Sequence, residues 1–156
     1  MMHTWFECKV RYEKTLENGM NKKVTEPYLV DALSFTEAEA RIIEEVSPYI
    51  SGEFTIADIK RANYTELFFC EEDSADRWFK CKLTFISLDE KSGAEKKTSS
   101  NVLVQAADLR DAVKKLDEGM KGSMMDYVIS SMAETAIMDV FPFSADPDEK
   151  PEFPQA

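Results

Sequence analysis

Apolar and polar side chains alternate along residues 4–14, which is the pattern of a β-strand with one buried face and one face in water. The apolar set, which we expect in the core, is Phe6, Cys8, Val10 and Tyr12. The polar set, which we expect in solvent, is Glu7, Lys9 and Arg11. The alternation ends near an Asn18-Gly19 pair, a strong hairpin signal because both residue types tolerate positive φ. The pattern therefore predicts a β-hairpin, with a second strand that continues to about residue 32.

After residue 34 the apolar positions recur every three or four residues, which indicates a helix with one buried face. The apolar positions are Phe35, Ala38, Ile42 and Val46. Ser34 and Thr36 are both followed three residues later by a glutamate, so each has the form of a capping box. Ser47-Pro48 ends the helix, because proline lacks the backbone N–H that a helix interior needs.

A third strand is predicted over residues 53–62, and a short fourth strand at residues 67–69. The alternation of the third strand slips by one position near Ala57-Asp58, and a β-bulge is the simplest cause of such a slip. The predicted order is therefore ββαββ, and we expect the fourth strand to close this unit.

The same pattern returns about 73 residues later, so the sequence indicates a tandem duplication. The clearest match is between Trp5-Phe6-Glu7-Cys8-Lys9-Val10 and Trp78-Phe79-Lys80-Cys81-Lys82-Leu83. The second copy decides between the two helix starts, because Asp108 corresponds to Ser34, whereas Arg110 corresponds to the later candidate. Arginine cannot accept a backbone N–H, so Ser34 and Asp108 are the expected caps. The slip of the third strand also recurs, near Ser130-Ser131.

These elements predict an α+β protein built from two ββαββ units related by a pseudo-twofold axis, with antiparallel strands in one joined sheet or two facing sheets. The first repeat covers residues 1–70, a charged linker covers 71–76, and the second repeat covers 77–143. Residues 144–156 are rich in proline and carboxylates, and we expect them to be disordered. A repeat of this size is marginal alone, so we expect the two repeats to share one core.

Charge and composition exclude several classes of protein. The net charge is −11, which repels nucleic acid phosphates over most of the surface. No stretch approaches the roughly 20 apolar residues of a membrane span. No basic segment of the signal-peptide type precedes the first apolar residues. We therefore expect a cytoplasmic protein that binds no membrane.

Residues with catalytic or metal-binding chemistry are few. His3 is the only histidine, and the three cysteines have no metal or redox spacing. The five glycines form no phosphate-binding loop. We therefore expect no enzymatic activity, no metal and no cofactor.

The most distinctive surface feature is the outward face of the two first strands. It carries Trp5, Lys9 and Arg11 in the first copy, and Trp78, Lys80 and Lys82 in the second. Aromatic rings beside cations on a sheet can stack bases or hold an anionic partner. The alternative is that each tryptophan packs at its strand end and the cations are simply solvated.

Three segments resemble a known family: residues 25–32 (TEPYLVDA), residues 35–41 (FTEAEAR) and residues 134–140 (ETAIMDV). They are similar to an uncharacterised family of small proteins of unknown function from Bacteroides and related gut bacteria and their mobile elements. The resemblance extends from about Thr4 to Phe143. It implies a bacterial or phage-like, cytoplasmic source, and it implies no activity and no functional residues.

The leading expectation is thus a non-enzymatic binding or interaction protein with an unidentified protein partner. The alternative is a protein that binds nucleotides or nucleic acid through the tryptophan–lysine face. An enzyme ranks third, and the sequence marks no oligomeric state.

Overall fold

The structure, a computed structural model, describes residues 4–123 and 126–142. Within these residues there are two helices and eight strands in two mixed sheets, which is an α+β fold. In chain order the elements are β1 (Thr4–Thr15), β2 (Asn21–Ala32), α1 (Phe35–Val46), β3 (Phe54–Ala62), β4 (Tyr64–Phe68), β5 (Arg77–Leu88), β6 (Glu95–Ala106), α2 (Leu109–Gly119), β7 (Asp126–Glu134) and β8 (Val140–Phe141). The predicted acidic, proline-rich tail lies outside the described residues.

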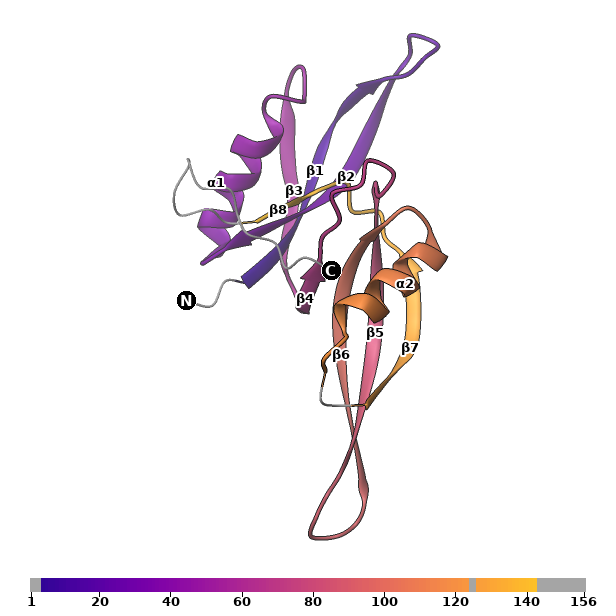
Figure 1. The fold of residues 1–156 in the computed structure, drawn as a ribbon. Helices are drawn as coiled ribbons and strands as arrows, with labels where there is room; N and C mark the ends of the chain where they lie inside the picture. Colours follow the sequence, from indigo (N-terminus) through magenta and orange to yellow (C-terminus); the bar gives the residue numbers. More distant parts are fainter. Residues whose placement is uncertain (1–3, 124–125, 143–156) are drawn as a thin grey trace. The chain divides into compact units, whose positions relative to one another are not determined.

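The described residues form two compact units. Among the described residues, unit 1 consists of Thr4–Ala62 and Ala136–Pro142, and unit 2 consists of residues between Asn63 and Thr135. The sheet of unit 1 has the strand order β3-β1-β2-β8, and the sheet of unit 2 has the order β4-β6-β5-β7. In each unit the helix packs on one face of its sheet, and a long hairpin extends past the other strands (Figure 1).

The fourth strand of each sequence repeat does not close its own unit, which corrects our expectation. β4 leaves β3 after a single residue, Asn63, and pairs in parallel with β6 of unit 2. β8 pairs in parallel with β2 of unit 1, through Leu29 opposite Val140 and Val30 opposite Phe141. The sheets are therefore mixed rather than purely antiparallel, and each one is completed by a strand from the other half of the sequence.

Helix caps and bulges lie where the sequence placed them. The Ser34 hydroxyl accepts the Glu37 N–H, and the Asp108 carboxylate accepts the Asp111 N–H. The pairing of β1 with β3 shifts between Lys9 and Val10, and the pairing of β5 with β7 shifts between Lys82 and Leu83. Those shifts lie opposite the two predicted slips, so both β-bulges are confirmed.

The first hairpin turn differs in detail from the prediction. Among the described residues only glycines have positive φ, so of the Asn18-Gly19 pair only Gly19 (φ 82°) is left-handed. The turn is a longer loop, in which the Gly19 N–H donates to the Leu16 carbonyl and the Leu16 N–H to the Met20 carbonyl.

Each unit has a cluster of buried side chains between its helix and its sheet. The predicted core residues of the first strands, Phe6, Cys8, Val10, Phe79, Cys81 and Leu83, are all buried. Lys80 and Lys82 are exposed as predicted, whereas Glu7 and Lys9 are half-buried. A single core common to both repeats stays a prediction. No helix in the described part of the chain is long and apolar enough to cross a membrane.

The first apolar residue of each helix is exposed, which corrects the expectation that Phe35 lies on a buried face. Phe35 is 47% exposed and Leu109 is 51% exposed, although both lie on the apolar side of their helices. Phe35 starts α1, where only one side of its ring is covered: the ring packs edge-on against Phe6 and lies 5.7 Å from the Arg61 guanidinium carbon.

Candidate functional site

In unit 1 the predicted tryptophan–cation strip is neutralised by its neighbours. Trp5, Lys9 and Arg11 share the face of β1 that points away from α1. On that face the register places Lys9 opposite Asp58 of β3. Glu7, which lies between Trp5 and Lys9, forms an ion pair of 3.3 Å with Lys60. Cations and carboxylates therefore alternate along this face, and Lys9 is not part of a continuous positive surface.

In unit 2 the corresponding lysines have neutral neighbours. Lys80 lies opposite Leu103 of β6 and Ala133 of β7, and Lys82 lies opposite Asn101 and Ser131. Both ammonium groups are on exposed side chains of one face of β5, two residues apart. In this half of the predicted strip, no carboxylate therefore lies directly opposite either lysine.

The two tryptophans are not equivalent. Trp78 is only 3% exposed, and its ring meets the edge of Phe69 at a centroid distance of 5.5 Å. Its backbone carbonyl accepts hydrogen bonds from the Thr135 N–H and hydroxyl, both at 2.9 Å. Trp5 is half-buried at the start of β1. Trp78 therefore packs as a structural residue, and its ring offers little surface for stacking on a ligand.

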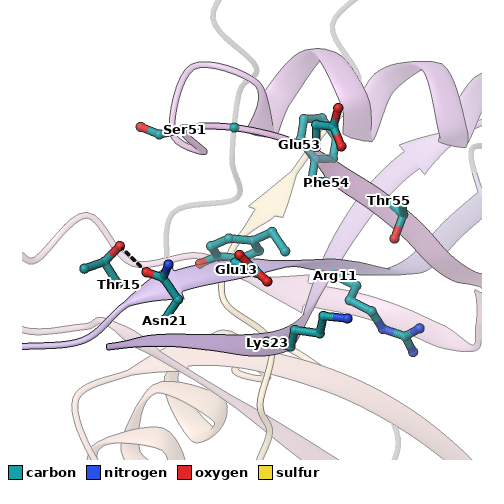
Figure 2. A pocket seen from close by; sticks show the side chains of 11 residues that line it. Arg11, Glu13, Thr15, Asn21, Lys23, Ser51, Glu53, Phe54 and Thr55 are labelled. Carbon is teal, nitrogen blue, oxygen red and sulfur yellow. Dashed lines mark hydrogen bonds between the residues drawn. The ribbon is translucent and has the colours of Figure 1, made fainter. Parts of the chain in front are cut away.

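A hollow of about 630 Å³ lies where β3 begins, next to the part of the β1–β2 hairpin that extends beyond β3. Its charged side chains are Arg11, Glu13, Lys23 and Glu53. Figure 2 shows Arg11 and Lys23 together at one end, Glu13 in the middle, and Thr15 with Asn21 at the other end. The loop before β3, which includes Ser51 and Glu53, forms the opposite side of the hollow.

Hydrogen bonds between the two hairpin strands hold the walls of this hollow. The Arg11 Nε donates to Thr25 Oγ1 at 3.4 Å, and Thr15 Oγ1 donates to Asn21 Oδ1 at 3.0 Å. The Tyr12 hydroxyl donates to Glu26 at 2.6 Å, and this hydrogen bond, with a smaller contribution from burial, raises the pKa of Tyr12 to about 12. The Tyr12 side chain therefore links β1 to β2 next to the pair formed by Arg11 and Thr25.

Sequence reasoning singled out Arg11 but missed the rest of the hollow. Glu13 and Lys23 are adjacent on paired strands, and Glu53 comes from a loop 30 residues further along the chain. A comparison of the two copies could have pointed to this surface, because its polar residues are not shared. The positions of Arg11, Glu13 and Thr15 are occupied in the second copy by Thr84, Ile86 and Leu88. Of the four charged positions of the hollow, those of Arg11 and Glu13 are therefore charged only in the first copy.

The buried thiols are poor nucleophiles. Burial, with a smaller effect of the Glu7 and Asp58 charges, raises the pKa of Cys8 to about 12. Burial and the charge of Asp117 raise the pKa of Cys81 to about 11. Within residues 4–123 and 126–142, no three His, Cys, Asp or Glu side chains converge as metal ligands would. The arrangement in the hollow is suited to non-covalent recognition by charge and hydrogen bonding.

Comparison with known proteins identifies one family. Residues 4–143 match the family model described as "Domain of unknown function (DUF4494)". No curated protein and no solved structure matches the chain at a significant level.

Proposed function

We propose that this chain, which belongs to that family of unknown function, is a non-enzymatic binding protein whose partner is another protein. The observation that carries the proposal is the charged hollow of unit 1. Four charged side chains of both signs surround an open depression on a hairpin that projects beyond its sheet.

The shape of the hollow favours a macromolecule over a small molecule. Small-molecule sites are mostly apolar and enclose most of the ligand surface. This hollow is open to solvent, and most of the residues that line it are polar or charged. A partner's own charged side chains, by contrast, can meet Arg11, Lys23, Glu13 and Glu53 in one orientation only, because a shift would place like charges together.

The test is affinity capture with cross-linking from lysate of source cells, comparing the wild-type chain with the double variant Arg11→Glu/Lys23→Glu. We expect a defined protein to be recovered by the wild type and lost with the variant, because reversing both cations reverses the charge pattern at one end of the hollow. The double variant Thr84→Glu/Lys97→Glu is the matched control, since those positions correspond to Arg11 and Lys23 in the second copy.

The control variant should recover the same protein as the wild type. Recovery that is equal in all three samples, or lost equally in both variants, would show that the hollow is not the contact surface. Thermal unfolding of each variant checks that the fold is retained.

A second candidate function is favoured by the neutral surroundings of Lys80 and Lys82. An anionic ligand, such as a nucleotide or a single-stranded nucleic acid, could bind on this face of unit 2. The strip predicted from the sequence consists of Trp5, Lys9 and Arg11 with Trp78, Lys80 and Lys82, and among these Lys80 and Lys82 have the strongest support. Binding of an oligonucleotide should weaken with added salt and disappear in Lys80→Gln/Lys82→Gln, whereas Lys9→Gln should have little effect because Asp58 already faces Lys9. A wild-type chain that binds no oligonucleotide at low salt would eliminate this candidate.

We also propose that the two halves of the sequence derive from duplication of a ββαββ segment, and that the protein acts in the cytoplasm of a gut bacterium or in one of its mobile elements. The support is the repeat of about 73 residues and the resemblance of the segments quoted above.

A further inference from the structure

Each sheet has a long strand at its edge. β3 is at one edge in unit 1, and β7 is at one edge in unit 2. Both strands cover nine residues and pair on one side only within the described part of the chain. An edge strand presents a row of unpaired N–H and C=O groups, which can pair with a strand of another chain.

The two edges are protected to different degrees. The second half of β3 carries Asp58, Lys60 and Arg61, and charges of this kind discourage pairing with a further strand. At the positions of Asp58 and Lys60, β7 has Ser131 and Ala133. Residues 127–133 include no charged side chain at all. The internal repeat thus supplies a direct comparison, in which one copy keeps a charged edge and the other does not.

The surface beside the uncharged edge is also more apolar than its counterpart. Val128 is 49% exposed and Leu88 is 70% exposed, and both lie on the face of the sheet opposite α2. The corresponding residues of the first copy are Thr55 and Thr15, which line the polar hollow. Exposed apolar residues next to an open strand edge are typical of an interaction site.

We propose that β7 pairs antiparallel with β7 of a second copy of this chain, about a two-fold axis that passes between Ser130 and Ser131. In such a symmetric contact, each residue opposes the one at the mirrored position of the partner strand. The axis sets Val128 opposite Ala133, and both of these residues lie on the outward face. It also sets Ile129 opposite Met132, and both of these lie on the face toward α2.

The β-bulge at Ser130 makes this register possible. In a regular strand, positions separated by an odd number of residues point to opposite faces, so Val128 and Ala133 could not oppose each other. The extra residue shifts the alternation by one, so that both ends of β7 present matching faces. The register also places Glu134 opposite Tyr127 and away from the carboxylate of the second Glu134, so no like charges face each other.

The net charge of −11 per chain makes the association of two copies depend on salt concentration. Two such chains repel each other at long range, and residues 127–133, which form the centre of the contact, supply no cation that would offset this repulsion. Screening by salt reduces the repulsion and leaves backbone hydrogen bonds unchanged. The association is therefore expected to strengthen as salt is added.

The experiment measures the molar mass of the full chain by sedimentation equilibrium over a range of protein and salt concentrations. We expect the mass to rise from that of one chain towards that of two, and to do so at lower protein concentration when salt is added. Ser131→Asp/Ala133→Lys, which installs the residue types of β3 at the same positions, should remain at the mass of one chain. Thr98→Lys/Ser99→Asp adds the same charges at exposed positions of β6 and should behave like the wild type.

A second measurement covers the case in which a variant fails to fold. In the wild-type chain, hydrogen exchange at the amides of residues 127–133 should slow as protein concentration rises, while exchange in β3 stays constant. The proposal is overturned if the wild type keeps the mass of one chain throughout. It is equally overturned if the Ser131→Asp/Ala133→Lys variant folds and associates as the wild type does, since the copies would then meet elsewhere.

Discussion

At the scale of single residues, Gly119 shows how closely α2 approaches β4. A Cβ atom added to Gly119 would lie 2.6 Å from Cε1 of Phe68, inside any normal contact distance. The Phe68 ring belongs to the buried cluster of unit 2 and is 3% exposed, so it has little room to move away. Glycine at this helix end is therefore required by packing, not by an unusual φ.

We predict that Gly119→Ala destabilises the protein, because overpacking a core usually costs about 1–3 kcal/mol. Alanine favours a helix over glycine by up to about 1 kcal/mol, so the observed loss will be the difference of the two effects. The measurement is the free energy of unfolding in urea. Glu118→Ala, at the exposed neighbouring position, is the control; an equal or greater loss there would show that the Phe68 contact is not the cause.

The cysteines provide a second prediction at this scale. Cys8 and Cys81 are fully buried and their pKa values are raised above the ordinary value of 9.0, so neither forms an appreciable amount of thiolate near pH 8. Cys70 is only half-buried. In the native protein an alkylating reagent at pH 8 should modify Cys70 first, as seen by mass spectrometry of peptides, and the other two only after denaturation. Rapid native labelling of Cys8 would contradict the packing of β1.

At the scale of elements, each helix carries a cation that contacts the segment after the last strand of a repeat. Arg41 of α1 contacts the segment after β8, and Lys115 of α2 contacts the segment after β4. Arg41 of α1 donates to the backbone carbonyls of Asp31 and Pro142, and the bond to Pro142 is 3.0 Å. At the same position on α2, Lys115 contacts Asp111 at 2.9 Å and Glu72 at 3.4 Å. Burial opposes the charged form of Lys115, but hydrogen bonds to Cys70 and Asp111 outweigh it and raise its pKa. The two helices use different chemistry for the same structural task.

We predict that Arg41→Ala loosens β8 and lowers the free energy of unfolding by about 1–3 kcal/mol, because it leaves two carbonyls without a charged donor. The change should be greatest in hydrogen exchange at the Leu29 N–H, which donates to the Asp139 carbonyl next to β8. Arg110→Ala, on the exposed surface of α2, is the control. Unchanged exchange at Leu29 would show that Arg41 is not what retains β8.

The elements also show how far a sequence can predict this fold. Caps and bulges follow from a few adjacent residues, so Ser34, Asp108 and the slips in β3 and β7 could be predicted. The destinations of β4 and β8 could not, because hydrophobic alternation says which face of a strand is buried and not which strand it pairs with. The hollow was likewise missed apart from Arg11, since Glu53 reaches it only through the pairing of β3 with β1.

At the scale of the whole molecule, β4 and β8 each join the sheet of the other half of the sequence, and this crossing of the chain makes only one of the two units continuous in sequence. All described residues of unit 2 lie in one continuous segment, Asn63–Thr135. Unit 1 is discontinuous and needs β8 from the far end of the described chain. A fragment that ends at residue 73 therefore contains β4 without its partner β6 and lacks β8.

We predict that residues 1–73 alone do not fold cooperatively, and that residues 63–135 alone give a sharper unfolding transition, since only the second fragment holds every strand of its sheet. Thermal unfolding followed by circular dichroism compares the two fragments of equal length. A sharp, reversible transition for residues 1–73 would mean that β8 is dispensable for unit 1.

The same crossing imposes an order on synthesis of the protein. When Thr135 has left the ribosome, every strand of the unit 2 sheet is available, and that sheet can form at once. The outer edge of β2 has no partner until Val140 and Phe141 have been synthesised. At this stage the sheet of unit 1 therefore still lacks β8, whereas the sheet of unit 2 is complete. The half of the protein that is translated first is therefore the half that is completed last.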